Sequence, residues 1–362
     1  MLLKEFWAGK RVLITGHTGF KGSWLAIWLN ELGANVAGYA LDPYSPRDNF
    51  VICGISDKII DIRGDVRDYG KVLSVFNDFK PQIVFHLAAQ PLVGLSYQIP
   101  KETYDINVGG TVNVLEAIRM TDSVAAGVMV TSDKCYENKE WVWGYRESDS
   151  LGGFDPYSSS KGAAEVVISG YRNSFFNPVN FQIHRKAIAS VRAGNVIGGG
   201  DWSQNRIIPD CIRALEQDIP IEIRNPNSIR PWQFVLEPLF GYIILAQKLC
   251  ESPEKYSEAW NFGPDLNSPV SVKEIAEQAI KFWGRGTWVD TSDRTTIHES
   301  SLLTLDCNKA KMKLGWHPNF NAEKAIEMTV AWYKKAWKDK YTQNMYDFCV
   351  EQIQKYSEIY YR

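Results

Sequence analysis

Short apolar runs alternate with longer segments of helical periodicity along the first half of the chain. A run at residues 10–16 leads into a glycine-rich turn, and residues 23–29 then continue with helical character. Further strand-like runs follow at 35–41, 59–62, 83–87 and 127–131. Strands that alternate with helices in this way build a parallel sheet with right-handed crossovers. The pattern therefore predicts an α/β fold with a doubly wound parallel sheet.

The sequence changes character in its second half, which predicts two lobes. We expect residues 1–185 to form the doubly wound domain, with a later segment at about 210–250 returning to it. From about residue 195 the chain is richer in Pro, Gly, Asn and Trp. Residues 186–362 are therefore expected to form mainly a smaller mixed α/β lobe that binds substrate, followed by C-terminal helices. The aromatic tail at 322–362 is expected to pack against the body or a partner chain.

Composition excludes several classes of protein. The 362 residues carry 40 basic and 42 acidic side chains, so no net basic field favours nucleic acid. No apolar run has the length of a membrane span, and residues 1–6 do not resemble a secretory signal. The six cysteines are far apart and lack a C-x-x-C pair, which argues against zinc and against a disulfide framework. We expect a cytoplasmic protein with no metal, membrane or nucleic-acid partner.

The glycine-rich turn between the first strand and the first long helix is a candidate dinucleotide site. Its sequence is Gly16-His17-Thr18-Gly19-Phe20-Lys21-Gly22, a G-x-x-G-x-x-G pattern. The glycines permit a tight turn, and the helix N-terminus offers N–H groups and a positive dipole to a pyrophosphate. The expected cofactor contacts are Gly16, His17, Thr18, Gly19, Phe20 and Gly22. The side chain of His17 could instead face solvent.

Other candidate cofactor contacts follow the next strands of the expected sheet. Asp42 is the best candidate to bind a ribose hydroxyl, but it lies two residues past the usual position, so the choice between NAD and NADP stays open here. Asp65 and Val66 could cradle an adenine. The small side chains of Leu87-Ala88-Ala89-Gln90 let the backbone approach a ligand at the carboxyl end of a strand.

Tyr157 and Lys161 form a candidate proton-transfer pair. Four residues apart on a helix, they share a face, so the ammonium of Lys161 would lower the phenol's pKa from near 10. Asp155-Pro156 just ahead is a plausible start for that helix. Many helices carry such a pair by chance, and only the upstream glycine turn makes it half of an oxidoreductase site.

These motifs together resemble the extended short-chain dehydrogenase/reductase family over nearly the whole chain. The segments that carry the resemblance are the glycine turn, Leu87-Ala88-Ala89, Asn107-Val108-Gly109-Gly110-Thr111, Ser132-Asp133 and Tyr157 with Lys161. Within the family, segment 131–136 resembles the nucleotide-sugar 4,6-dehydratases. Segments 143–147, 152–157, 230–233, 298–299 and 305–306 resemble those members that act on CDP-D-glucose. The resemblance implies a Rossmann-type fold, NAD with Asn107 among its contacts, CDP-D-glucose as substrate, and a homodimer or homotetramer.

The resemblance also implies roles for individual side chains in deoxysugar formation. Tyr157 would take the proton of the sugar 4-hydroxyl while C4 gives a hydride to NAD, and Lys161 would hold the nicotinamide ribose. Ser132 would orient the 4-oxygen. Asp133, kept protonated, would donate to the departing 6-hydroxyl as a general acid. The hydride then returns to C6, so NAD is regenerated and need not leave.

Lys134 departs from the dTDP-glucose relatives, which carry Glu at this position. A lysine can be the C5 base only if its surroundings depress its pKa from about 10.4. Otherwise it is a charge partner, and a water or another residue is the base. The expected substrate contacts are Asn195, Arg206, Arg230, Trp232 and His298, because guanidinium groups suit a diphosphate and Trp can pack on a ring.

Three other functions stay open at this point. A nucleotide-sugar 4-epimerase shares the oxidation step, but it expels no water and has no use for Asp133 and Lys134. A 4,6-dehydratase could act on another nucleotide, because the residues that read the base are not apparent from the sequence. An NAD-sensing binding protein is disfavoured by the intact Ser132, Tyr157 and Lys161.

Overall fold

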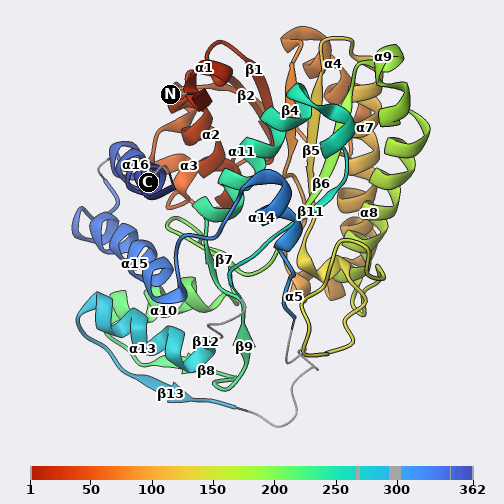
Figure 1. Cartoon of the computed structure of the whole chain (residues 1–362). Coiled ribbons are helices and arrows are strands. Elements are labelled where there is room, and N and C mark those ends of the chain that lie inside the picture. Colours follow the sequence, from red (N-terminus) through yellow and green to blue (C-terminus); the bar gives the residue numbers. More distant parts are fainter. Residues whose placement is uncertain (1, 266–269, 293–302, 343, 361–362) are drawn as a thin grey trace.

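A seven-stranded parallel sheet forms the centre of the chain and confirms the predicted fold class (Figure 1). The computed structural model describes residues 2–265, 270–292, 303–342 and 344–360. The strand order is β11-β6-β5-β4-β1-β2-β3, and every neighbouring pair is parallel. The strands are β1 (Arg11–Thr15), β2 (Asn35–Ala40), β3 (Ile60–Arg63), β4 (Ile83–His86), β5 (Ala126–Val130), β6 (Ala187–Ala193) and β11 (Ala259–Phe262).

The direction of strand order reverses at β1, which lies between β2 and β4. Val12 of β1 pairs with Val36 on one side and with Ile83 on the other. The chain builds outward through β2 and β3, then crosses back to β4. Ligands of open α/β sheets bind in the crevice at such a reversal, beyond the carboxyl ends of the strands.

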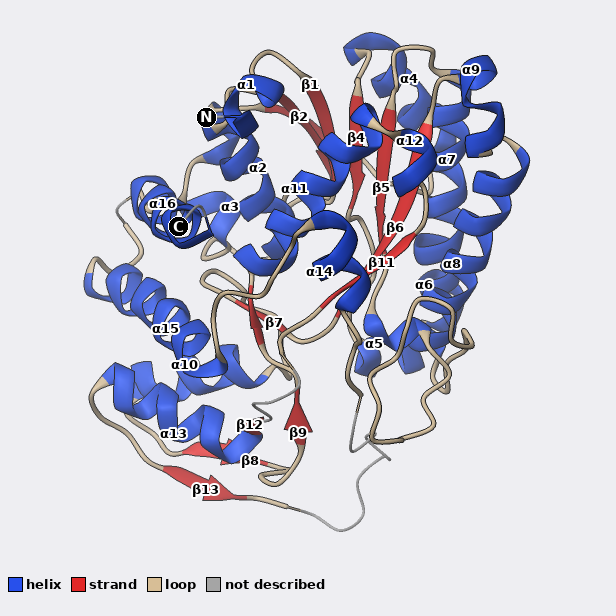
Figure 2. Cartoon of the chain, viewed as in Figure 1, coloured by secondary structure: helices blue, strands red, loops and turns tan. Residues whose placement is uncertain are grey.

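Helices cover both faces of the sheet, as the buried, mostly apolar strands require (Figure 2). On one face lie α2 (Phe20–Glu31) and α11 (Leu236–Glu251), and on the other lie α4 (Tyr69–Phe79), α7 (Gly110–Met120) and α8 (Pro156–Ser174). The buried side chains form one cluster on each side, with Trp24 and Phe240 in the first and Val114 and Phe76 in the second. Two layers of helix therefore fix the sheet from both sides.

The sheet takes strands from beyond residue 185, because β6 and β11 continue it past β5. The second lobe contains α10 (Ile207–Gln217), α13 (Val272–Trp283) and three small two-stranded sheets. These pair β7 (Val196–Ile197) with β10 (Gln233–Phe234), β8 (Ile221–Ile223) with β13 (Trp288–Asp290), and β9 (Ile229–Arg230) with β12 (Val270–Ser271). The lobe lies below the carboxyl ends of the central strands in Figure 1.

Two C-terminal helices, α15 (Ala322–Lys338) and α16 (Tyr346–Tyr360), pack against the body. Glu237 at the start of α11 fixes them: its carboxylate accepts from the Tyr356 hydroxyl at 2.7 Å and from the backbone N–H of Phe320 at 2.7 Å. Burial raises the pKa of Glu237 to about 7. The expected packing of the aromatic tail against the body is confirmed.

Short helices complete the chain: α1 (Leu2–Trp7), α3 (Asn49–Ile52), α5 (Val93–Gln98), α6 (Pro100–Tyr104), α9 (Phe181–His184), α12 (Pro253–Tyr256) and α14 (Asn308–Leu314). In the described part of the chain, no helix is long and apolar enough to cross a bilayer. The described residues also contain no group of three His, Cys, Asp or Glu side chains that could hold a metal ion.

Candidate active site

The glycine turn is closed so tightly that its first and last glycines admit no side chain. Gly16 has φ +77°, and a Cβ there would lie 2.7 Å from the backbone N of Ala88. A Cβ on Gly22 would overlap the carbonyl oxygen of Gly16. Gly19 caps α2 without a side-chain hydrogen bond, so the first N–H groups of that helix are left for a ligand. This cradle fits a dinucleotide pyrophosphate.

The side chain of His17 lies away from the opening of the turn. It is fully buried, its Nε2 is 2.8 Å from Asp61 Oδ1, and its ring packs on Gly38 of β2. Burial lowers the pKa of His17, and the hydrogen bond to Asp61 opposes this fall. The alternative that His17 faces solvent is therefore wrong. Its imidazole holds the turn to β2 and β3, so it is no exposed cofactor contact in this structure.

The turn is also tied to the end of β2, where the ribose contact is expected. Thr18 Oγ1 donates to the carbonyl of Leu41 at 3.0 Å. The next residue, Asp42, has an 87% exposed side chain and lies 3.4 Å from Arg63 Nε. An exposed carboxylate at this edge fits the predicted ribose contact, and Arg63 is a neighbour that the sequence did not indicate.

The candidates after β3 differ in how open they are. Asp65 accepts a 2.6 Å ion pair from Arg67, whose hydrogen bond is the main reason that the pKa of Asp65 is lowered. Val66 is buried against Gly110, where an added Cβ would lie 2.7 Å away. Of these two residues, only the partly exposed Asp65 remains accessible for the predicted adenine contact.

Gln90 and Asn107 are structural in the described conformation. Asn107 Oδ1 accepts from the backbone N–H of Gln90 at 2.8 Å, and its amide donates to Ser160 Oγ at 2.9 Å. The side chain of Gln90 donates to Thr103 Oγ1 at 3.0 Å. Both side chains are buried, so they hold the loop after β4 against α8 instead of presenting polar groups to a ligand. The backbone of Leu87, Ala88 and Ala89 lies between that loop and the glycine turn.

The helix that carries the proton-transfer pair begins as the sequence predicts. Asp155 is the N-cap of α8 and accepts from the backbone N–H of Ser158 at 2.9 Å, and Pro156 occupies the first helical position. Tyr157 and Lys161 follow one turn apart, and both are buried. The pair therefore faces the protein interior at the carboxyl end of the sheet.

Ser132 and Asp133 meet Tyr157 at this point. They follow β5, where Ser132 caps a short 3₁₀ turn (Asp133–Cys135). Ser132 Oγ donates to Asp133 Oδ1 at 2.9 Å, and its hydroxyl also acts on the phenol of Tyr157, whose pKa it lowers. The loop after β6 closes the other side, because a Cβ on Gly194 would lie 2.5 Å from Asp133 Oδ2. The end of β5 and the start of α8 thus bring the predicted catalytic side chains together, and the loop after β6 encloses them.

Burial dominates the protonation of these groups. Burial raises the pKa of Tyr157 to about 12, while the hydrogen bond from Ser132 and the charge of Arg206 oppose the rise. Arg206 is thus the cation that lowers this pKa in the structure, and the expected effect of Lys161 on it stays a prediction. Burial also raises the pKa of Asp133, against the opposing charge of Lys134. A carboxyl whose pKa is raised by burial is better suited to act as a general acid.

Burial lowers the pKa of Lys161 to about 8, and the positive charge of Lys21 adds to the fall.

Cys135, next to these groups, has a buried thiol, and burial raises the pKa of this thiol well above its usual value. A raised pKa disfavours the thiolate that a reactive cysteine needs.

Three of the predicted substrate contacts lie near this cluster. A small hollow of about 20 Å³ is lined by Asp133, Lys134, Asn195, Arg230 and Leu303. Arg206 begins α10 and donates to Asp201 Oδ2 at 2.7 Å. Trp232 is buried, and no described residue accepts from its indole N–H. His298 lies outside the described residues.

Four residues near the site were missed by the sequence reasoning: Lys21, Asp61, Arg63 and Asp201. Only the charge of Lys21 within the glycine turn could have indicated one of them.

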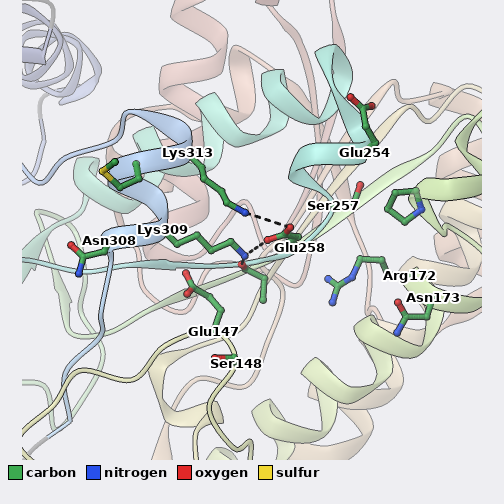
Figure 3. Close-up of a pocket in the computed structure, with 13 residues that line it drawn as sticks. Glu147, Ser148, Arg172, Asn173, Glu254, Ser257, Glu258, Asn308, Lys309 and Lys313 are labelled. Atoms are coloured by element: carbon green, nitrogen blue, oxygen red, sulfur yellow. Dashed lines mark hydrogen bonds and ion pairs between the residues drawn. The ribbon is translucent and has the colours of Figure 1, made fainter.

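A larger cavity of about 880 Å³ lies elsewhere, between the C-terminal end of α8, α12, α14 and the first residue of β11. Figure 3 shows Lys309 and Lys313 pointing from α14 toward Glu258, with which both form ion pairs. On the other side, Arg172 and Asn173 extend from α8. None of the predicted site residues lines this cavity.

The fold and the site together define a class of protein. A Rossmann-type sheet with a glycine turn, followed by Ser132, Tyr157 and Lys161 in one buried cluster, is the arrangement of the extended short-chain dehydrogenases/reductases. Comparison with known proteins specifies the family. The family described as GDP-mannose 4,6 dehydratase matches residues 13–329, and the chain belongs to it.

Relatives and solved structures agree with this membership. A CDP-glucose 4,6-dehydratase of Salmonella typhimurium is 52% identical over 338 residues, covering 93% of this chain and 94% of the relative. A dTDP-D-glucose 4,6-dehydratase of Mus musculus is 27% identical, covering 90% and 89%. Among solved structures, a UDP-glucose 4-epimerase of Thermotoga maritima with UDP-glucose has TM-score 0.76 at 20% identity, covering 90% and 99%. A dTDP-glucose 4,6-dehydratase of Bacillus anthracis in complex with NAD has TM-score 0.74 at 20% identity, covering 91% and 98%.

Proposed function

We propose that this chain converts CDP-D-glucose to CDP-4-dehydro-6-deoxy-D-glucose and water, as an NAD-dependent 4,6-dehydratase of deoxysugar biosynthesis. The observation that carries the proposal is the buried cluster of Tyr157, Ser132 and Asp133, in which Ser132 Oγ donates to Asp133 Oδ1. It joins an alcohol-oxidising base to a buried carboxyl that can protonate a leaving hydroxyl. The choice of CDP-D-glucose rests on the Salmonella relative.

NAD, when bound, takes the hydride from C4 and returns it to C6. The turn from Gly16 to Gly22 would hold its pyrophosphate, Asp42 would bind a ribose hydroxyl, and Lys161 would bind the nicotinamide ribose. Tyr157, as phenolate, takes the proton of the 4-hydroxyl. Ser132 donates to the same sugar oxygen and fixes its direction.

The ketone at C4 makes the proton on C5 acidic, so elimination across C5 and C6 follows. Lys134 would take the C5 proton, the C6–O bond breaks, and Asp133 gives its proton to the departing oxygen to form water. After the hydride has reached C6, Lys134 returns its proton to C5. The product retains the C4 ketone.

The hydrogen bond between Ser132 and Asp133 offers a way to balance the protons of each turnover. Each turnover removes one proton from O4 and needs one on the leaving O6. Because Ser132 Oγ donates to Asp133 Oδ1 and also acts on the Tyr157 phenol, it would offer a path from one to the other. Tyr157 would return to phenolate, and Asp133 to the acid, without exchange with bulk water.

The substrate diphosphate would be bound by guanidinium groups on the second lobe. Arg206 faces Tyr157, and Arg230 lines the hollow beside Lys134 and Asn195. Both positions put positive charge around the reacting sugar, where a nucleoside diphosphate needs it. Trp232 offers a ring surface for packing.

A 4-epimerase is the second candidate, because a UDP-glucose 4-epimerase shares the fold over 90% of this chain. Both functions are tested by incubating the purified protein and NAD⁺ separately with CDP-, dTDP-, UDP- and GDP-glucose. We expect a 4-keto-6-deoxy sugar, identified by mass spectrometry, with CDP-glucose preferred. Formation of the 4-epimer without loss of water would support the epimerase instead, and preference for another nucleotide would refute the assignment of CDP-D-glucose.

A further inference from the structure

Lys21, in the glycine turn, belongs to the face of α2 that packs over the segment after β6. On that face, Trp24 Nε1 donates to the carbonyl of Gly199 at 2.9 Å. Phe20 reaches Gly198, where an added Cβ would lie 3.0 Å from its ring. Because Lys21 precedes Trp24 by three residues, both side chains lie on the same side of the helix. The half-buried ammonium of Lys21 is thereby directed into the protein.

The ammonium of Lys21 lies within electrostatic range of two carboxyl groups and two cations, which are Asp133, Asp201, Arg206 and Lys161. Asp201 is already paired with Arg206 at 2.7 Å. Within the described residues, Lys21 makes no hydrogen bond and no ion pair within 4.0 Å. Asp133 is therefore the carboxyl near Lys21 that has no cation bound to it.

A half-buried cation without a fixed partner costs free energy in the resting protein. Such a charge becomes favourable if an opposite charge forms beside it during the reaction. In the proposed dehydration, Asp133 is the group that changes from neutral acid to carboxylate. The negatively charged partner of Lys21, the Asp133 carboxylate, therefore forms only when Asp133 gives its proton to the departing hydroxyl.

We propose, on the basis of the function proposed above, that Lys21 is a positioning residue for Asp133. Its ammonium stabilises the carboxylate that remains when the proton of Asp133 moves to the departing 6-hydroxyl. In that step the C6–O bond breaks with its electron pair on oxygen, the Asp133 proton completes the water molecule, and Lys21 keeps its own proton. Without this charge, Asp133 would be a weaker acid.

Several titratable or charged groups face Asp133, and the test must separate them. They are Lys134 on its own turn, Tyr157 on α8, Cys135 and Lys21. Burial lowers the pKa of Lys21 to about 8, an effect that the charge of Arg206 increases. Lys21 therefore carries its charge at neutral pH and loses it in the alkaline range.

Lys21→Met tests the proposal, with Lys21→Arg as the conservative variant and Lys71→Met as a control at an exposed lysine on α4. In single turnovers with CDP-D-glucose, we expect Lys21→Met to slow water loss about tenfold while C4 oxidation is spared, since a nearby cation changes a carboxyl pKa by about one unit or more. The alkaline limb of water loss should move to higher pH. Lys21→Arg should restore both quantities, and Lys71→Met should change neither.

Equal slowing of oxidation and water loss with an unshifted pH profile would indicate a merely structural role and overturn the proposal. If the native protein forms no 4-keto-6-deoxy product, the proposed function is refuted. The role of Lys21 is then tested by a measurement that needs no substrate. Carbon-13 NMR titration of the Asp133 carboxyl, assigned with Asp133→Asn, should give a higher pKa in Lys21→Met than in the native protein. An unchanged titration overturns the proposal.

Discussion

Replacing Tyr157 with Phe will lower the turnover of CDP-D-glucose by about 100- to 10,000-fold, the usual contribution of a positioned general base. The variant keeps the ring that α8 buries and removes only the hydroxyl that Ser132 binds. Without a base for the 4-hydroxyl, oxidation at C4 fails, so no later step can occur. The measurement is the initial rate of 4-keto-6-deoxy product at saturating NAD⁺.

The matched control is Tyr97→Phe, since Tyr97 on α5 has 47% of its surface exposed. This variant should retain native activity. If Tyr157→Phe still oxidises C4 at a rate near that of the native protein, another group is the base, and the mechanism proposed above is contradicted at its first step.

Replacing Lys134 with Ala will stop the reaction after oxidation. Lys134 lines the hollow beside Asn195 and Arg230, at the side of Asp133 where the sugar would lie. Without its amine, C5 keeps its proton and the 6-hydroxyl stays in place, so we expect a loss of water formation of about 100-fold or more. The oxidised sugar can be trapped with borodeuteride, which puts deuterium at C4 of a hexose that still carries its 6-hydroxyl.

Lys139→Ala is the control for this substitution, because Lys139 is exposed in the loop that follows. Unimpaired dehydration by Lys134→Ala would mean that a water or another residue is the C5 base. The two lysine variants are also distinguishable: Lys134→Ala should block water loss at every pH, whereas Lys21→Met should shift its pH dependence.

The sequence predicted the elements that local patterns determine. The parallel sheet follows from apolar runs separated by helical segments, and the start of α8 follows from Asp155 and Pro156. The glycine turn was predictable because only glycine fits Gly16 and Gly22. The grouping of Ser132, Asp133 and Tyr157 was implied by the resemblance to the extended short-chain dehydrogenase/reductase family, and it agrees with the position of a ligand site at one edge of a parallel sheet.

The destinations of single polar side chains could not be predicted in the same way. His17 turns inward because its Nε2 is hydrogen-bonded to Asp61 Oδ1 on β3, and that pairing joins residues 44 apart in the chain. Gln90 and Asn107 bind each other and α8, so their amides are taken up by the loop they hold. Lys21 lies on the helix that Trp24 fixes over Gly199. Each of these contacts depends on packing between distant segments.

The transfer of the C4 hydrogen tests the central claim most directly. Native protein is incubated with NAD⁺ and CDP-D-glucose that carries deuterium at C4, and the product is analysed by mass spectrometry and NMR. The mechanism with Tyr157, Lys134 and Asp133 predicts one water lost and the deuterium at C6 of a 4-keto sugar. Deuterium that returns to C4 of an epimerised sugar, with no water lost, would contradict it.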